Sequence, residues 1–185
     1  SLLQEFPTSQ AIFAPGGKPP KPGVVLYQKD LAKTFQAIAE GGRDAFYQGP
    51  IAEAMVKFCQ EQGGLLSMKD LADCRSRWEE PISTTYKGYS VYEAPPNSSG
   101  HILLQELNMV EQFDLRSMGC STAESIHMMV EAKKLAFEDR AKFYADPAFA
   151  QVPVEQLISK EYAAERAETL DMGRARMAPG PGSPV

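Results

Sequence analysis

Only one short stretch of this 185-residue sequence alternates in the manner of β-structure, and it limits the folds that the chain can adopt. Between Pro81 and Ala94, β-forming side chains recur on either side of Lys87-Gly88, which predicts two strands joined by a tight turn. Pro95-Pro96 ends the second strand, because a proline nitrogen cannot donate to a ladder. Two strands are too few for an independent sheet of ordinary size. We expect the hairpin to join a sheet whose remaining strands come from chain outside this sequence. The alternative is a mainly helical domain with a lone hairpin.

Helical periodicity, broken by glycine and proline, accounts for most of the remaining sequence. Residues 14–23 hold four prolines and three glycines and are expected to be a connector. Helices are predicted at 29–40 and 50–62, because Gly41-Gly42 and Gly63-Gly64 supply the stops. A weak capping box from Ser67 to Asp70 predicts a third short helix.

Three more helices are expected after the hairpin. Polar groups of residues 97–100 can cap the first, which runs to about Gln112 with an apolar stripe of Leu103, Leu104, Leu107 and Val110. A capping box from Ser121 to Glu124 opens a long helix, whose stripe is Ile126, Met129, Val130, Lys133, Ala136, Phe137 and Arg140. The third spans 153–169. Residues 172–185 hold almost no core-forming side chains, so a flexible tail is expected after a structured region of residues 1–171.

Composition narrows the classes of partner. The chain is 43% hydrophobic and 23% charged, as in an ordinary globular domain. Its net charge is −5, and scattered basic residues argue against nucleic acid or an anionic membrane, which leaves a small polar substrate open. Cys59, Cys74 and Cys120 form neither a CxxC pair nor an even disulfide framework, and no cofactor is predicted. The first residues lead without a Met into a Pro/Gly-rich segment, so a fragment or processed chain is expected.

Two histidines are the first candidates for site chemistry. His101 follows a polar strand-to-helix loop and has the stronger functional claim. His127 borders the stripe of the long helix and is expected to be a packing or surface residue. A metal enzyme built on both with nearby acids is the weakest hypothesis, because their spacing matches no recognised ligand set.

Other polar residues have simpler structural interpretations. Glu138, Asp139, Arg140 and Asp146 cluster near the end of the long helix, where a catalytic acid and base could be sought. A charge run at a helix end more often forms a solvated face or a structural ion pair. Arg140 is placed to bond Asp146 or carbonyls of the following turn. Thr84-Thr85 lies inside a predicted strand, so its side chains are expected to form sheet and not to act as nucleophiles.

A series of short sequence motifs, taken in order along the chain, resembles the γ-glutamyltranspeptidase family from about residue 10 to residue 170. Individually most are weak, but a dozen or more in register are specific. They include Ile38-Ala39-Glu40-Gly41-Gly42, Phe46-Tyr47-Gln48-Gly49, Asp70-Leu71-Ala72, Tyr86-Lys87-Gly88-Tyr89-Ser90-Val91, Pro95-Pro96-Asn97-Ser98-Ser99-Gly100, Glu131-Ala132-Lys133, Asp139-Arg140 and Asp146-Pro147.

The resemblance implies an α+β fold, as part of the four-layer αββα sandwich of N-terminal-nucleophile hydrolases. It implies a precursor that cuts itself after a segment corresponding to residues 172–185, with this chain as the C-terminal part of the large subunit. The partner would be a small subunit whose N-terminal threonine attacks a γ-glutamyl amide and passes the acyl group to water or an amine. The nucleophile and the carboxylate-gripping arginine of the family lie outside this sequence.

The resemblance leaves one loop as a candidate substrate-binding element: Ser98, Ser99, Gly100 and His101. Many relatives carry a second glycine where this chain has His101, a departure associated with paralogues that act on other substrates. Oxamate amidohydrolases and cephalosporin acylases are therefore alternatives to a glutathione-cleaving enzyme, and a catalytically silent binding module is a third.

Overall fold

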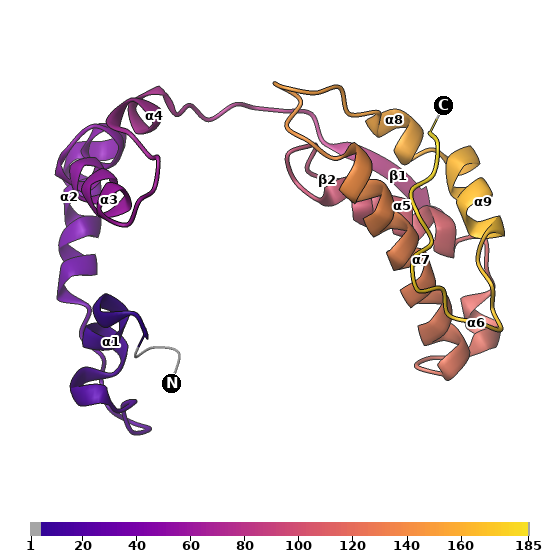
Figure 1. The fold of residues 1–185 in the computed structure, drawn as a ribbon, viewed down its shortest axis with the longest axis horizontal. Coiled ribbons are helices and arrows are strands. Elements are labelled where there is room, and N and C mark those ends of the chain that lie inside the picture. Colours follow the sequence, from indigo (N-terminus) through magenta and orange to yellow (C-terminus); the bar gives the residue numbers. More distant parts are fainter. Residues whose placement is uncertain (1–4, 185) are drawn as a thin grey trace. The chain divides into compact units, whose positions relative to one another are not determined.

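A computed structural model describes residues 5–184 and divides the chain into two compact units, one ending at Arg77 and one beginning at Trp78 (Figure 1). The sequence did not predict this boundary. Each unit has its own buried apolar cluster. In the described part of the chain, no helix combines the length and apolar character needed to cross a lipid bilayer.

The first unit is helical. Its elements are α1 (Pro7–Phe13), the short 3-10 helix η2 (Pro15–Gly17), α2 (Lys29–Tyr47), α3 (Pro50–Glu61) and α4 (Met68–Asp73). No sequence pattern predicted α1, which begins with a proline in its first turn, where a backbone N–H would have no acceptor within the helix. Ala52, Val56 and Leu71 form the core between α3 and α4.

The glycine pairs end or interrupt these helices much as predicted. Gly42 has a φ of 60° and a ψ of −149°, so α2 loses its helical geometry there and regains it for one more turn. Gly63, with a φ of 78°, follows the end of α3. The weak capping box is confirmed: the Ser67 hydroxyl accepts the Asp70 N–H, and the Asp70 carboxylate accepts the Ser67 N–H at 2.8 Å.

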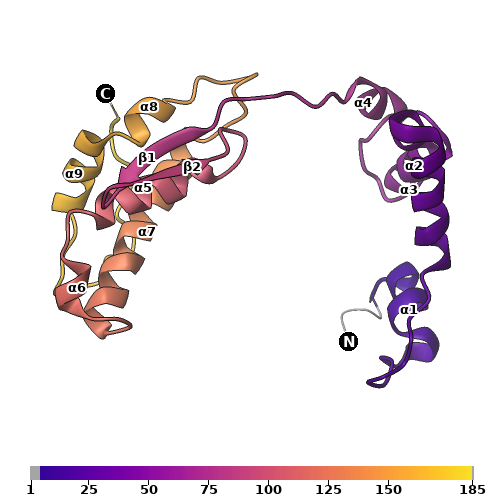
Figure 2. The same ribbon diagram turned by 180° about the vertical axis from the view of Figure 1, so that it is seen from behind.

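The second unit opens with the predicted hairpin, β1 (Ile82–Tyr86) and β2 (Tyr89–Glu93), paired antiparallel with Ile82 opposite Glu93 and Tyr86 opposite Tyr89. Lys87 and Gly88 both have positive φ, 48° and 88°, the requirement of a two-residue turn that matches strand twist. These are the two strands of the sheet within residues 5–184. One face of the hairpin packs on α5 (Gly100–Val110), as Figure 2 shows.

Helices complete the second unit: α6 (Leu115–Met118), α7 (Ala123–Phe143), α8 (Val154–Leu157) and α9 (Lys160–Glu168). Both α7 and α9 pack on α5. Their shared core includes Ile102, Met109, Met128, Ala132, Leu135 and Ala163. The mainly helical fragment with one hairpin agrees with the predicted fold class.

Three details of the helical prediction were wrong. The capping box of α7 lies one residue later, between Thr122 and Ser125, because Ser121 has a positive φ of 56° that a helix excludes. Residues 153–169 form two helices, because the Ser159 hydroxyl accepts the Tyr162 N–H and starts α9 anew. The short helix α6 was not predicted; the Asp114 side chain caps it by accepting two backbone N–H groups.

The predicted apolar stripe of α7 does not face the core, apart from Ala136. The buried face holds Met128, Ala132, Leu135 and Asp139, and its alanines let α7 approach its neighbours closely. Four members of the predicted stripe are 43–47% exposed: Ile126, Met129, Val130 and Phe137. On α5, Leu103 is likewise exposed, whereas Leu104 and Val110 are buried as predicted.

Candidate functional site

The turn between β2 and α5 contains the residues that the sequence singled out, and Ser98 closes it. The Ser98 hydroxyl donates to the Ala94 carbonyl at 2.6 Å and accepts the Gly100 N–H at 3.2 Å. Its backbone N–H donates to the Pro95 carbonyl at 2.9 Å. The predicted capping of α5 therefore comes from Ser98. Ser99, the residue before the helix, is exposed and makes no capping bond with its side chain.

Gly100 is needed where α5 meets the end of β2. A Cβ atom at this position would lie 2.5 Å from the Ala94 carbonyl oxygen and 2.7 Å from the Glu93 Cβ. Both distances are far below van der Waals contact, so the junction accepts only glycine without a backbone shift. Gly100 thus allows α5 to approach the end of β2 closely, and it offers no side chain to a ligand.

His101 is completely buried, and its ring stacks on Tyr144 with centroids 5.2 Å apart and planes at 16°. Neither ring nitrogen has a hydrogen-bond partner within residues 5–184. Burial lowers the pKa of His101 below its usual 6.5, and the positive charge of Arg140 adds to this, whereas the Ser98 backbone opposes it. His101 is therefore neutral at pH 7 and closed to solvent. Of the four residues predicted to bind substrate, Ser99 alone is exposed, and the binding role of all four stays a prediction.

The structure gives His127 a different environment. It is half-buried on α7, and its Nε2 lies 2.8 Å from the Asp171 carbonyl oxygen, which ties α7 to the segment after α9. Within residues 5–184, no three histidine, cysteine or acidic side chains lie close enough to hold a metal ion, and the three cysteines are unbridged.

The acidic cluster of the sequence separates into distinct environments. Asp146 accepts the Ala148 N–H at 2.9 Å in a local turn. Arg140 lies over the rings of Phe137 and Tyr144, at 5.9 and 5.5 Å from their centroids. Asp139, by contrast, is fully buried. The interpretation of this run as structural is borne out by Asp139, which forms an ion pair with Arg166 at 3.2 Å.

Asp139 is the centre of a buried polar group that we call the Asp139 cluster: Gln105, Asp139, Tyr162, Arg166 and the backbone of Gly182. The carboxylate accepts from Gln105 Nε2, from the Tyr162 hydroxyl at 3.0 Å and from the Gly182 N–H at 2.7 Å. Burial raises the pKa of Tyr162, and the Asp139 carboxylate raises it further. A buried carboxylate needs partners of this kind, and those of Asp139 tie three helices and one loop together. Two other buried atoms of the cluster, Gln105 Oε1 and Arg166 Nε, have no hydrogen-bond partner within residues 5–184.

Sequence reasoning missed most of this cluster. Tyr162 and Arg166 stand four residues apart on α9 and so share a helix face, which is the one signal that could have paired them. Gln105 and Gly182 carried no signal, because each meets Asp139 across more than thirty positions of chain.

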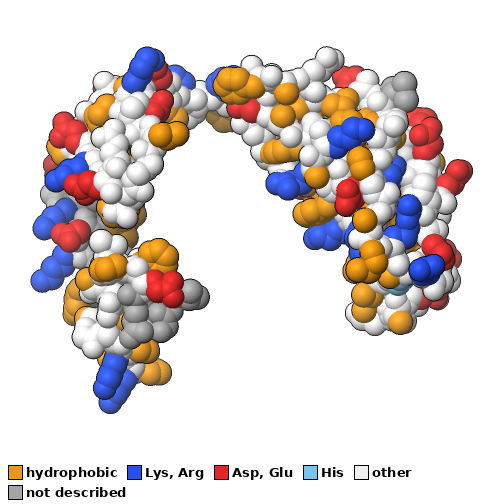
Figure 3. Space-filling view, viewed as in Figure 1, with side chains coloured by type: hydrophobic (Ala, Val, Ile, Leu, Met, Phe, Trp, Pro, Cys, Tyr) orange, Lys and Arg blue, Asp and Glu red, His pale blue; other side chains and the backbone are white. Residues whose placement is uncertain are grey.

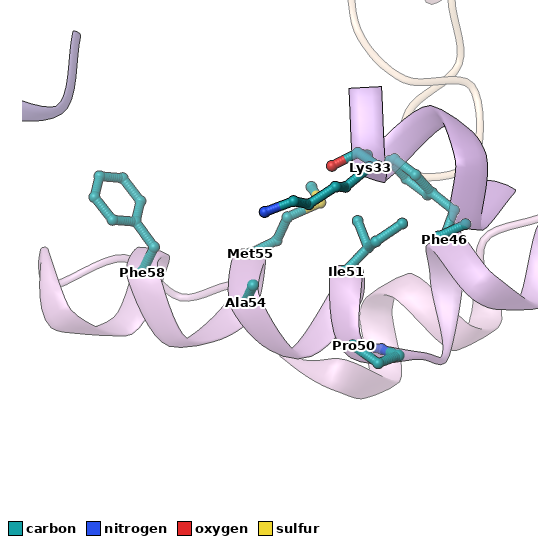
Figure 4. A pocket seen from close by; sticks show the side chains of 9 residues that line it. Lys33, Phe46, Pro50, Ile51, Ala54, Met55 and Phe58 are labelled. Atoms are coloured by element: carbon teal, nitrogen blue, oxygen red, sulfur yellow. The ribbon is translucent and has the colours of Figure 1, made fainter. Parts of the chain in front are cut away.

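The first unit contributes an apolar groove of about 650 Å³ between α2 and α3. Figure 4 shows Phe46, Ile51 and Met55 along it, with the Lys33 side chain extending above them. Apart from Lys33, its lining includes no titratable side chain, so it suits packing against another apolar element better than chemistry.

Comparison with known proteins gives the context for these features. Residues 1–183 match the sequence model described as gamma-glutamyltranspeptidase. The chain is 42% identical, over 95% of its length, to a glutathione hydrolase proenzyme of Escherichia coli (strain K12), and 42% identical, over 94%, to the acylase ACY 1 proenzyme of Pseudomonas sp. (strain SE83). It spans only 30% and 31% of these two relatives, about a third of their length.

Solved structures agree. The chain superposes on gamma-glutamyltranspeptidase of Helicobacter pylori with a TM-score of 0.81 and 35% identity, covering 91% of this chain and 49% of that one. The match to cephalosporin acylase of Bacillus halodurans has a TM-score of 0.83 and 39% identity. It covers 95% of this chain and 32% of the acylase chain.

Proposed function

Because this chain belongs to the gamma-glutamyltranspeptidase family, we propose that it is the C-terminal part of the large subunit of a self-processed enzyme that cleaves γ-glutamyl amide bonds, such as that of glutathione. The observation that carries the proposal is the family match over residues 1–183, with 42% identity to a glutathione hydrolase proenzyme. The word proenzyme in the names of the relatives supports maturation by cleavage.

The proposed reaction is covalent catalysis by a threonine at the N-terminus of the small subunit. Its α-amine takes the hydroxyl proton, the oxygen attacks the γ-carbonyl, and the C–N bond breaks as the leaving amine receives that proton. Hydrogen-bond donors stabilise the oxyanion. Water or a second amine then cleaves the resulting ester and regenerates the hydroxyl. In this scheme the present chain supplies scaffold, and Ser99 is the side chain of the 98–101 loop best exposed to meet a substrate.

The partner in this proposal is the small subunit of the same precursor. Support comes from the outer face of α7, where Ile126, Met129, Val130 and Phe137 are exposed. Figure 3 shows hydrophobic and basic side chains on the α7 side of the second unit. Apolar side chains clustered on one helix face are typical of surfaces that another chain covers.

The proposal is tested on the full-length gene product. Mass spectrometry should find two chains, the second beginning with threonine, and the protein should turn over a γ-glutamyl anilide. Replacing that threonine with alanine should leave one uncut chain without activity. An uncut chain with full activity would contradict the mechanism, and a cut protein with no turnover of any amide would favour a silent binding module.

An acylase is a second candidate, favoured by the 42% identity to an acylase proenzyme and by His101 in place of a second glycine. Initial rates with a γ-glutamyl anilide, oxamate and a cephalosporin bearing an acyl side chain, compared at equal enzyme concentration, separate the two candidates. A preference above tenfold for either of the last two substrates would transfer the assignment to that class.

A further inference from the structure

Residues 171–184, which we call the strap, run along α7 and meet successive turns of that helix (Figure 1). The Asp171 carbonyl lies 2.8 Å from His127 Nε2. The Arg176 N–H donates to Glu131 Oε2 at 3.2 Å, and the Gly182 N–H donates to Asp139 Oδ1 at 2.7 Å. His127, Glu131 and Asp139 are spaced by four and eight residues, so the three anchors lie on different turns of α7.

The middle anchor is a buried carboxylate. Glu131 is 2% exposed, and its Oε1 accepts from Lys134 Nζ at 2.6 Å; that ammonium also donates to the Arg176 carbonyl at 2.9 Å. Burial alone would raise the pKa of Glu131, but the bonds from Lys134 and from the Arg176 N–H outweigh it and hold the pKa below its usual value. Both backbone groups of Arg176 are therefore bound by charged side chains.

The last anchor is specific for glycine. A Cβ atom on Gly182 would lie 2.1 Å from the Tyr162 hydroxyl oxygen and 2.9 Å from Arg166 Cδ. Arg166 Nη2 also donates to the Gly180 carbonyl at 2.9 Å and to the Leu135 carbonyl at 3.2 Å. The strap backbone thus enters the Asp139 cluster so closely that no side chain fits.

We propose that the strap is a positioning element for self-cleavage: its anchors on Glu131 and Asp139 fix the path of the chain at Pro184, so that the peptide bond to be cut enters the processing site in one register. The inference rests on the proposed function, in which the cut follows this segment. Its physical basis is orientation, since a displacement of about 1 Å can cost about a hundredfold in rate. Asp139 and Glu131 act here as positioning residues, through the strap backbone.

The test uses the full-length precursor and follows the appearance of two chains on a gel over time. Gly182→Ala should slow processing about tenfold or more, because the methyl group forces the strap off the Asp139 cluster. Gly173→Ala is the matched control: its Cβ would meet only Asp171 Oδ1, at an ordinary 3.4 Å, and should process like wild type.

Two further variants separate positioning from a general loss of stability. Met109→Ala opens a cavity in the core, and Met109 takes no part in the hydrogen bonds described above for the strap, so the change should lower the melting temperature without slowing processing well below that temperature. Tyr162→Phe in the Gly182→Ala background removes the oxygen that the methyl group overlaps, and should recover part of the lost rate although it also removes a hydrogen bond to Asp139.

The outcomes are distinct. A wild-type precursor that never splits overturns the proposed function and this inference with it. A wild type that splits while Gly182→Ala splits equally fast overturns the strap alone. If Met109→Ala slows processing as much as Gly182→Ala does at equal loss of melting temperature, stability explains the effect and positioning is refuted.

Discussion

At the scale of single residues, His101 combines full burial with an unpaired imidazole ring. Its ring is fully buried, stacks on Tyr144 and leaves both nitrogens without partners in residues 5–184. A buried polar group without a hydrogen bond destabilises the fold, so packing of the ring, and not hydrogen bonding, stabilises His101 in this position. His101 stands where many relatives are expected to carry a second glycine. This chain therefore buries an aromatic ring where the turn after β2 joins α5.

This burial predicts a pH dependence of stability. The folded-state pKa of His101 is lowered from 6.5, so the unfolded chain binds a proton that the folded chain resists. The contribution to stability is intact above pH 6.5 and declines as the pH falls below it, with a slope of up to about 1.4 kcal/mol per pH unit. Urea unfolding at pH values from 7.5 to 5.0 gives the free energy of unfolding and so measures this pH dependence.

The control is His101→Phe, which keeps a ring against Tyr144 and cannot titrate. Its free energy of unfolding should fall less steeply than that of wild type between pH 6.5 and 5.0. Identical slopes for the two proteins would show that His101 is not the group responsible.

At the scale of elements, the start of α5 depends on two neighbouring serines with different roles. Ser98 makes the bonds that close the turn, whereas Ser99 makes no side-chain capping bond and is exposed. Ser98→Ala should lower the free energy of unfolding by about 1 kcal/mol, as loss of a helix cap does, and Ser99→Ala should change it by less than about 0.5 kcal/mol. Paired denaturant titrations compare them.

The same pair tests the candidate substrate loop. In the full enzyme, Ser99→Ala should raise KM for the γ-glutamyl anilide if the exposed hydroxyl meets substrate, and the stability data show that any such change is not a folding defect. Unchanged KM and kcat would remove Ser99 from the proposed site and leave the loop with a structural role.

At the scale of the whole molecule, the small subunit of the proposed enzyme is expected to cover the exposed apolar face of α7. Val130→Glu places a carboxylate in that face, where Val130 is 45% exposed. The change should leave the melting temperature of this chain nearly unaltered, yet reduce recovery of the two processed chains as one complex in size-exclusion chromatography. Burial of an unpaired charge at the interface is the physical reason.

Lys142→Glu is the control, because Lys142 lies on the same helix and is exposed outside the apolar face. It should leave the complex intact. Equal loss of the complex in both variants would indicate a general charge effect, and no loss in either would show that this face stays uncovered.

Much of the local structure was predictable from the residues. The hairpin follows from alternation and from Lys87-Gly88, and most helix ends follow from glycine, proline and capping side chains, all of which act within a few residues. The family resemblance could also be identified from the order of short sequence motifs along the chain. These features are local or linear, so the sequence by itself determined them.

Tertiary structure decided which side chains are buried together. Apolar periodicity suggested Ile126, Met129, Val130 and Phe137 as the inner face of α7, but the small and polar residues on another face pack against α5 and α9. The strap is a second example: a segment poor in core-forming residues is held by backbone bonds to Glu131 and Asp139, more than forty positions away. The flexibility of this segment stays a prediction, which hydrogen exchange of its backbone amides measures. Local patterns encode no contact across such separations, which is why burial and the Asp139 cluster emerge only when the chain is folded.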